Sequence, residues 1–323
     1  MSVLIYTENW DGKFKKLSYE LVSYGSKLAE MLNTNSIALS IGDVDESELK
    51  TLGLYGASKV ITVNDEKLAN LDSRAYSKVI SGVAEKEGAT VLVLANNNTG
   101  KALAPRLSVR LKAAVGACVS KLPLDTEPFT IYKKVYSGNA FARVALKTDV
   151  KIITLAQNSF ELIETDNKAL IENAEVDVDG SLITTQVKDV QKQTGHLLLT
   201  DAEIVVSGGR GMKSPDNWAP IEELADLLGA ATACSRPVSD EGWRPHNEHT
   251  GQTGKVIAPN LYFAIGISGA IQHLAGISST KCIVAINTDK DAPIFEAATY
   301  GIIGDAHKVL PELISAVKQM KQS

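Results

Sequence analysis

The sequence contains few cysteines and no long apolar run, and both absences limit what the protein can be. Cys118, Cys234 and Cys282 lie far apart without a C-x-x-C pair, which predicts buried thiols in a reducing compartment rather than disulfides or a metal site. No uninterrupted apolar stretch reaches the roughly 18 residues that a membrane span needs. The first residues, MSVLIYTEN, lack the basic region and cleavage site of a secretory signal. We therefore expect a cytoplasmic, globular protein without a membrane span.

A dense basic run is also missing, and the formal net charge is -5. Because the phosphates of nucleic acids are bound by clustered Lys and Arg, we do not expect a general nucleic-acid binder. The length of 323 residues exceeds one average domain, and a chain of this size most naturally forms two domains, each with its own core.

Several enzyme signatures are incomplete. The segment TGQTGK, residues 250–255, looks like half of a phosphate-binding loop, but His249 stands where the first Gly is needed and Val256 where a magnesium-binding hydroxyl is needed. The patterns G-x-G-x-x-G and G-x-S-x-G, typical of dinucleotide binding and of serine hydrolases, do not occur. His246 and His249 are three residues apart, but they lie in a predicted loop without an evident third ligand, so we expect no metal site.

The first half of the chain alternates short apolar runs with amphipathic stretches. This alternation predicts consecutive βα units and a parallel sheet, because parallel neighbours need crossover connections. The runs are apolar on both faces, as expected of strands that helices cover on each side. The predicted strands are residues 3–8, 36–42, 59–65 and 90–97, and the predicted helices are residues 17–32, 46–56, 76–86 and 100–112.

Beyond Ala114 the pattern changes. Residues 129–146 and 151–157 alternate, which predicts antiparallel additions to the same sheet, and residues 182–187 read as a further β segment. Apolar content is low in residues 188–194, so we place the domain boundary there. The predicted fold is α/β with two domains: residues 1–190 form a parallel-sheet, nucleotide-binding-like domain, and residues 191–323 form a doubly wound domain.

In the second half, each glycine-rich or polar cluster follows the end of a predicted strand, which is where open α/β sheets bind ligands. The segment GISGAIQH predicts a strand that ends at Gly266 and a helix that starts near Ser268. Free N–H groups at such a helix start suit a pyrophosphate, although a plain tight turn accounts for the same residues. Gly269 would permit a close approach of the ligand.

Polar residues follow other strands of the same half. Arg210 lies in the turn SGGRG and Arg236 in the segment CSRP. A guanidinium there could bind phosphate or carboxylate, or it could form an ordinary surface ion pair. Asn287 and Asp305 each end a predicted strand, so we expect them along the same edge of the sheet.

Taken together, VSGGRGMK, CSRPVSDEGW, TGQTGKVIAPNLYFAIGISGAIQHLAGI and CIVAINTDKDAPIFEAATYGIIGD resemble one family. It is the α subunit of electron transfer flavoprotein, also called the FixB type in bacteria. The resemblance covers residues 202–313, and residues 1–190 are similar only in layout.

The resemblance implies a heterodimer of this α subunit with a β subunit, on which the N-terminal domain would pack. It implies one FAD, held mainly by the C-terminal domain, and an AMP held by the β subunit. Such a protein accepts electrons from acyl-CoA dehydrogenases, as in fatty acid β-oxidation, and passes them to electron transfer flavoprotein quinone oxidoreductase at the membrane. It is an electron carrier and not an enzyme with a substrate of its own.

The resemblance also implies roles for individual residues. The hydroxyl of Thr253 would lie near flavin N5, where it can both donate and accept, and residues 268–273 would wrap the ribityl and phosphate portion. His273 would reach flavin O2, and His273 and Arg236 would offset the negative charge that reduction places on that edge. The implied cofactor-binding residues are Arg210, Ser235, Arg236, Thr250, Gly251, Gln252, Thr253, Ser268, Gly269, Ala270, Ile271, Gln272, His273, Asn287, Asp305 and Ala306.

The sequence departs from the family pattern at two places. His249 and Thr250 stand where Gln and Val are common, and Ala306 follows Asp305 where a bulkier residue is common. Two other functions remain open: an NAD-dependent enzyme on a similar domain, with Lys255 as a catalytic residue, and a scaffold subunit without a cofactor. The missing glycine fingerprint and its ribose-binding acid weigh against the enzyme.

Overall fold

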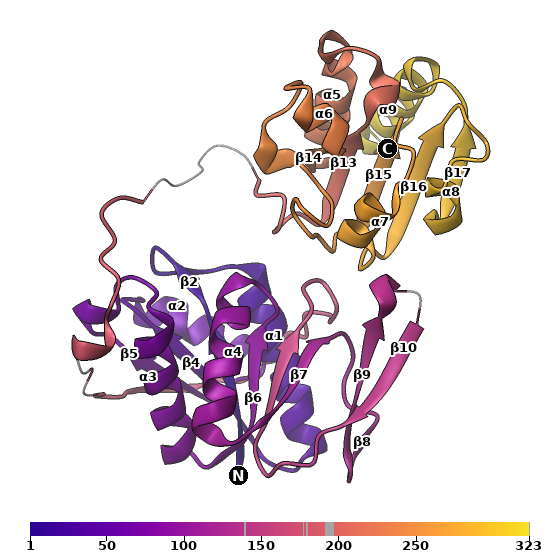
Figure 1. The fold of residues 1–323 in the computed structure, drawn as a ribbon. Helices are drawn as coiled ribbons and strands as arrows, with labels where there is room; N and C mark the ends of the chain where they lie inside the picture. The colour runs from indigo at the N-terminus through magenta and orange to yellow at the C-terminus, as the bar shows by residue number, and fades with distance from the viewer. Residues whose placement is uncertain (139, 177, 179, 191–196, 323) are drawn as a thin grey trace. The chain divides into compact units, whose positions relative to one another are not determined.

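A computed structural model describes residues 1–323 except 139, 177, 179, 191–196 and 323. The chain divides into two compact units, Met1–Val190 and Gln191–Ser323, called unit 1 and unit 2 below (Figure 1). The boundary segment expected at residues 188–194 lies partly outside the described residues. No described helix is both long enough and apolar enough to cross a membrane.

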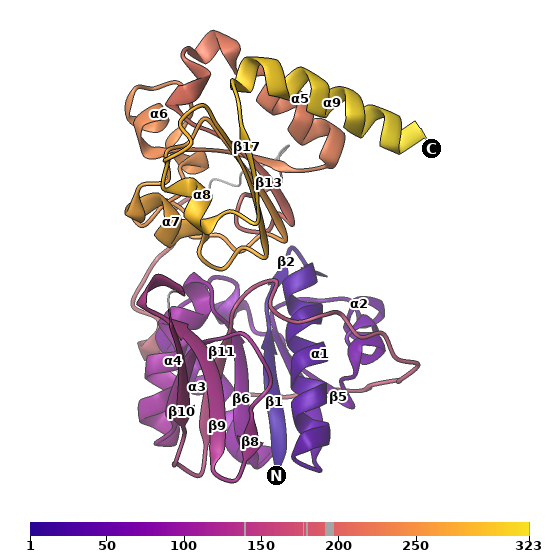
Figure 2. The same cartoon turned by 90° about the vertical axis from the view of Figure 1, so that its right-hand side faces the viewer.

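Unit 1 is built on a ten-stranded sheet in the order β10-β9-β7-β11-β6-β1-β4-β5-β12, with β8 paired to β9. The central strand β1 pairs in parallel with β4 and β6 and is buried along its whole length. Helix α1 packs on one face of the sheet, and α3 and α4 pack on the other (Figure 2). The strands are β1 (Ser2–Thr7), β2 (Asn9–Trp10), β3 (Lys13–Phe14), β4 (Asn35–Ile41), β5 (Lys59–Val63), β6 (Ala89–Ala95), β7 (Ala114–Val119), β8 (Asp125–Thr126), β9 (Phe129–Val135), β10 (Ala140–Ala145), β11 (Lys151–Leu155) and β12 (Leu170–Asn173), and the helices are α1 (Lys16–Met31), α2 (Glu46–Thr51), α3 (Ser73–Lys86) and α4 (Asn98–Leu111).

Local capping residues set where two of these helices begin. The carboxylate of Asp72 accepts hydrogen bonds from the backbone N–H groups of Arg74 and Ala75, which begins α3. The amide oxygen of Asn97 accepts from the N–H of Gly100 at 2.9 Å, which begins α4. Both side chains satisfy donors that the first turn of a helix leaves without a partner.

Two expectations for the end of unit 1 were wrong. Strand β11 is parallel to both β6 and β7, whereas the sequence pattern suggested an antiparallel addition. Its residues Ile152 to Leu155 are buried, which fits a central strand covered on both faces. Residues 183–187 form no strand, and residue 182 ends a short 3-10 helix. The antiparallel pairing expected within residues 129–146 is confirmed by β9 and β10.

Unit 2 is a five-stranded, wholly parallel sheet in the order β14-β13-β15-β16-β17. Helices α5 and α9 pack on one face, and α7 and α8 pack on the other (Figure 2). This confirms the predicted α/β architecture of the second half. The elements are β13 (Ile204–Gly208), α5 (Ala219–Leu228), β14 (Ala231–Cys234), α6 (Arg236–Asp240), the 3-10 helix η7 (His246–Glu248), β15 (Leu261–Ile265), α7 (Ile271–Ile277), β16 (Cys282–Asn287), α8 (Ile294–Ala297), β17 (Tyr300–Ile303) and α9 (Ala306–Gln322).

Candidate functional site

The carboxyl edge of the unit 2 sheet collects the residues that the sequence singled out. Because the strands are parallel, their carboxyl ends meet at one edge. Arg210 follows β13, Ser235 and Arg236 follow β14, and residues 266–273 follow β15. Asn287 ends β16, and Asp305 and Ala306 follow β17.

Residues 250–255 come from the long segment between η7 and β15, yet backbone hydrogen bonds bring them to the same edge. The N–H of Thr250 donates to the carbonyl of Cys234 at 3.0 Å, and the N–H of Gln252 donates to the carbonyl of Gln272 at 2.8 Å. Gly251 and Gly276 allow this approach, because a Cβ on Gly276 would lie 2.5 Å from Cα of Gly251. Helix α7 therefore packs directly on the backbone of this segment, which we call the cofactor loop.

The turn before α7 differs from the sequence prediction. Helix α7 begins at Ile271, not near Ser268. Gly269 has a φ of +83° and a Cβ there would lie 2.3 Å from the backbone nitrogen of Ile294, so the chain makes a left-handed turn before the helix can begin. Among the described residues, the N–H groups of residues 268–272 have no acceptor within the protein. The turn therefore presents consecutive free donors, which suits an anionic group.

A buried tyrosine and histidine lie behind this turn. The hydroxyl of Tyr262 lies 2.9 Å from Nε2 of His273, and both side chains are buried. Burial lowers the pKa of His273 to about 4, and burial also raises the pKa of Tyr262. Both groups are therefore neutral, and the phenol oxygen and Nε2 share one proton, with the tautomer of the imidazole setting which of them donates. Tyr262 was absent from the predicted site, although a tyrosine within a buried strand signals a hydroxyl that needs a partner.

Four buried polar atoms near these strand ends and loops have no hydrogen-bond partner among the described residues. They are Oγ of Ser207, Nδ1 of His249, Oγ1 of Thr250 and Nδ1 of His273. Ser207 nevertheless lies close enough to the Tyr262 hydroxyl, and the backbone of Thr250 close enough to the His273 ring, to act on the pKa of each. A buried polar atom without a partner costs stability, and a bound ligand or water is one usual explanation.

The two predicted arginines remain accessible. The side chain of Arg210 is 67% exposed and lies 3.9 Å from Glu241, and that of Arg236 is 62% exposed and lies 3.2 Å from Asp240. Exposed pairs of this kind contribute little to stability, so either guanidinium can exchange its partner for a ligand. Thr253 and Gln252 are also exposed, whereas Thr250 is fully buried.

The residues expected at the adenosine end have partners within the protein. The amide of Asn287 donates to the carbonyl of Ile267 at 2.9 Å, which fixes the turn after β15. The carboxylate of Asp305 accepts from the N–H of His307 at 3.0 Å and from Lys213 at 3.2 Å. Ala306 is buried at the start of α9. The structure thus gives Asn287 and Asp305 roles in shaping the edge.

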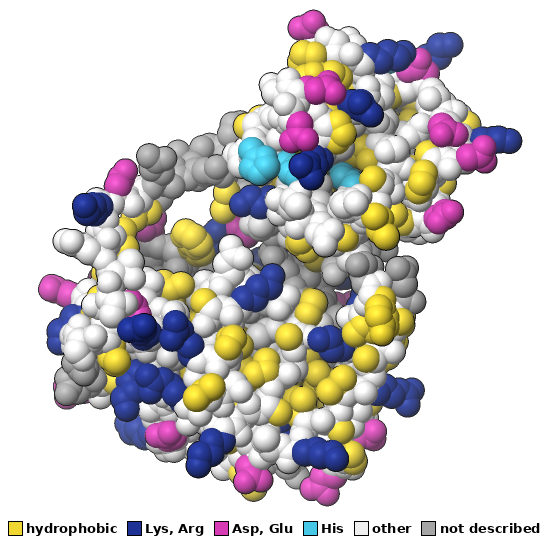
Figure 3. All heavy atoms as spheres, viewed as in Figure 1, with side chains coloured by type: hydrophobic (Ala, Val, Ile, Leu, Met, Phe, Trp, Pro, Cys, Tyr) yellow, Lys and Arg dark blue, Asp and Glu magenta, His cyan; other side chains and the backbone are white. Residues whose placement is uncertain are grey.

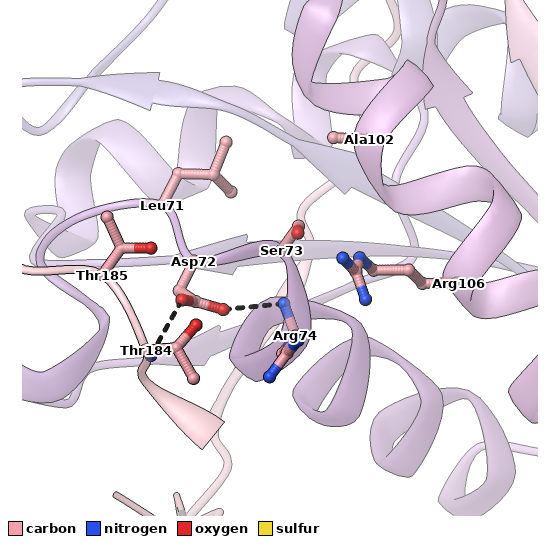
Figure 4. Close-up of a pocket in the computed structure, with 8 residues that line it drawn as sticks. All are labelled: Leu71, Asp72, Ser73, Arg74, Ala102, Arg106, Thr184 and Thr185. Carbon is pink, nitrogen blue, oxygen red and sulfur yellow. Dashed lines mark hydrogen bonds between the residues drawn. The ribbon is translucent and has the colours of Figure 1, made fainter. Parts of the chain in front are cut away.

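Two other features concern residues that the sequence did not assign to the site. His246 and His249 have ring centroids 5.3 Å apart, but the described residues contain no cluster of three or more side chains suited to a metal ion. In unit 1 a hollow of about 350 Å³ lies between α3 and α4, lined by Arg74, Arg106 and Thr184 among others (Figure 4). Asp72 in this hollow already binds backbone N–H groups, and no predicted site residue lines it.

Comparison of the sequence with known proteins identifies the family to which the chain belongs. The profile of the electron transfer flavoprotein domain matches residues 3–179, and that of the electron transfer flavoprotein FAD-binding domain matches residues 198–278. The electron transfer flavoprotein α subunit of Bacillus subtilis is 36% identical over 319 residues, which cover 98% of each chain. The chain belongs to the electron transfer flavoprotein family.

Other relatives extend this similarity. The probable mitochondrial electron transfer flavoprotein α subunit of Caenorhabditis elegans is 35% identical and covers 98% of this chain and 93% of its own. A protein of Anaerotignum propionicum, named acryloyl-CoA reductase electron transfer subunit beta, is 31% identical and covers 99% and 96%. This chain is thus an electron transfer flavoprotein α subunit, and its matched FAD-binding domain, residues 198–278, lies in unit 2.

The carboxyl edge of unit 2 fits FAD, the cofactor of this electron transfer flavoprotein domain. The free N–H groups of residues 268–272 suit the pyrophosphate. The side chain of Ile271 at the start of α7 is 72% exposed. Oγ1 of Thr250 and Nδ1 of His273 are buried polar atoms at this same edge, without an acceptor or donor side chain among the described residues.

Proposed function

We propose that the protein relays electrons from acyl-CoA dehydrogenases to a membrane quinone oxidoreductase, as a heterodimer with a β subunit that holds AMP. It acts as a carrier and turns over no substrate of its own. The observation that supports this proposal best is the set of free N–H groups at residues 268–272 beside the cofactor loop, within the matched FAD-binding domain. The name of the Anaerotignum propionicum relative, an electron transfer subunit, agrees with a carrier.

When FAD is bound, it accepts and releases the electrons. The chain has to bind it, orient it and offset the charge that reduction adds. We assign residues 268–272 to the pyrophosphate and ribityl portion, because their N–H groups lack acceptors within the described protein. Asn287, Asp305 and Ala306 shape the adenosine end of the site.

The cofactor loop would run beside the flavin ring. The hydroxyl of Thr253 is exposed and can donate or accept at N5 as the oxidation state changes. Arg210, Ser235 and Arg236 lie at the ends of the neighbouring strands, and the exposed guanidinium of Arg236 provides positive charge for the reduced ring.

His273 would act as a neutral donor and not as a cation. We assign Nε2 as the acceptor from Tyr262, which leaves Nδ1–H as the ring donor, between the nearby backbone of Thr250 and the flavin edge. A fixed N–H dipole stabilises developing negative charge without a change of protonation. In this proposal Tyr262 is a positioning residue that selects this tautomer of His273.

A visible spectrum of the protein purified with its β partner tests the proposal. Flavin absorption bands that reduce with an acyl-CoA dehydrogenase and its substrate, and reoxidise with the quinone oxidoreductase, are the expected result. A colourless preparation that binds NAD would instead favour a dinucleotide-dependent enzyme, and a colourless preparation without nucleotide would favour a scaffold subunit.

A further inference from the structure

The imidazole of His249 fills the inside of the cofactor loop. The residue is only 2% exposed, and its carbonyl accepts the N–H of Lys255 at 2.7 Å, which closes the loop around it. A Cβ on Gly254 would lie 2.8 Å from Cγ and Nδ1 of the ring, and a Cβ on Gly251 would lie 3.4 Å from Nε2. The path of the loop therefore follows the outline of this side chain.

The charged and titratable groups around His249 come from several elements. His246 of η7 faces it with ring centroids 5.3 Å apart. Arg236 and Asp240 of α6 act on it electrostatically, and His249 in turn acts on His273 of α7. In addition, its backbone bridges to Cys234 of β14, whose thiol has a pKa raised to about 12 by burial.

These surroundings disfavour a positive charge on His249. Asp240 favours the positive charge, but burial and His246 outweigh it, and the pKa of His249 is lowered. Nδ1 of His249 has no partner among the described residues, so a proton there would be buried without an acceptor. On the face of unit 2 that Figure 3 shows, histidine side chains lie next to side chains of Lys or Arg.

We infer that His249 is a positioning residue for FAD: its neutral imidazole holds the cofactor loop against α7, and its protonation releases the loop and weakens FAD retention. The inference rests on the proposed function, because it assigns the loop to FAD. It concerns a residue for which the family comparison implied no role.

The burial of His249 decides whether a fall in pH opens or closes the cofactor loop. Burial first, and then His246, lower the pKa of His249 below its ordinary value. When the loop opens, the imidazole meets water and regains the ordinary histidine pKa of about 6.5. Opening therefore takes up a proton, and the open state gains population as the pH falls below that value.

The rate of FAD dissociation from the FAD-loaded heterodimer tests the inference. The rise in flavin fluorescence after dilution would be followed between about pH 5.5 and pH 8, above the range in which His273, with a pKa of about 4, titrates. We expect the parent rate to rise severalfold toward low pH, by at most about tenfold per pH unit for one proton. His249→Gln, which keeps a neutral polar side chain, should give a flat profile with a rate near that of the parent at pH 8.

His246→Gln is the matched control, because His246 is exposed and lies outside the loop. It should keep the pH dependence, since the titrating group remains. A His249→Gln variant with the parent profile, or a parent profile that is flat, would overturn the inference.

Amide hydrogen exchange of residues 250–255 in the full chain without FAD provides a second measurement. After correction for intrinsic exchange, the loop should lose protection toward low pH in the parent but not in His249→Gln, and equal behaviour would overturn the inference. A chain that binds no FAD at any pH would contradict the proposed function instead, and the exchange measurement would still decide the role of His249.

Discussion

The hydroxyl of Tyr262 lies 2.9 Å from Nε2 of His273, so one hydrogen bond joins two buried neutral side chains. Tyr262 is inaccessible to solvent on β15, and His273 is buried in the first turn of α7. Two neutral partners that share one hydrogen bond avoid the cost of a buried charge. The pair joins the core of the sheet to α7, the helix that begins after the turn at Gly269.

Tyr262→Phe should lower the free energy of unfolding of unit 2 by about 1–3 kcal/mol, because Nε2 of His273 would lose its buried hydrogen-bond partner. Urea unfolding, followed by the fluorescence of Trp218 and Trp243, measures the change. Tyr300→Phe is the control, since Tyr300 is 65% exposed and should tolerate the loss of its hydroxyl. Equal stability of Tyr262→Phe and the parent would contradict the role of the hydrogen bond.

Unit 2 should lose stability as the pH falls from about 6.5 to about 4. The pKa of His273 is lowered to about 4 in the folded protein, so the unfolded state binds the proton more tightly across that window. Above about pH 6.5 the lowered pKa of His273 contributes roughly 3 kcal/mol to the free energy of unfolding, and this contribution is lost as the pH falls to about 4. Urea unfolding at a series of pH values measures it. His273→Gln should reduce the slope, and an unchanged slope would assign the pH dependence to other groups.

Gly276→Ala should weaken FAD binding by at least about tenfold, a loss of about 1.4 kcal/mol. The added Cβ would lie 2.5 Å from Cα of Gly251, so α7 and the cofactor loop would have to separate. Equilibrium dialysis of FAD against the heterodimer measures the affinity. Gly82→Ala in α3 is the matched control: a Cβ there meets no atom within 4 Å, and the change should stabilise the helix slightly. Unchanged FAD affinity in Gly276→Ala would show that the close contact is dispensable.

Arg236→Ala should make the flavin reduction potential more negative, because the exposed guanidinium no longer offsets the charge of the reduced ring. The difference should shrink as salt is added. Redox titration of the heterodimer measures it. Lys281→Ala removes the same charge just before β16, at the opposite edge of the sheet, and should leave the potential unchanged. Equal shifts in both variants would indicate an effect of net charge alone.

Thr253→Ala should leave FAD bound but alter the rate of flavin reduction, since the residue is exposed on the loop and offers one hydroxyl. Thr253→Ser retains that hydroxyl and should restore the parent rate. Stopped-flow reduction by an acyl-CoA dehydrogenase compares the three proteins. Identical traces for the parent and Thr253→Ala would remove Thr253 from the flavin edge.

Much of the fold was predictable because the signals were local. The apolar run at residues 90–97 and the amphipathic stretch at residues 17–32 became β6 and α1 with small shifts at their ends. Hydrophobic periodicity and capping residues act between near neighbours in the chain. The direction of β11 was missed because pairing with β6 and β7 depends on strands far away in the sequence.

The sequence by itself determined two α/β halves, the polar and glycine-rich clusters at strand ends, and the motifs of the electron transfer flavoprotein family. Only the tertiary structure decided that Thr250 meets Cys234, that α7 begins after Gly269, and that Tyr262 pairs with His273. The physical reason is the distance along the sequence over which each kind of interaction acts. Helix and strand formation depend on residues a few positions apart, whereas burial and hydrogen bonding within the site depend on segments that meet only after folding.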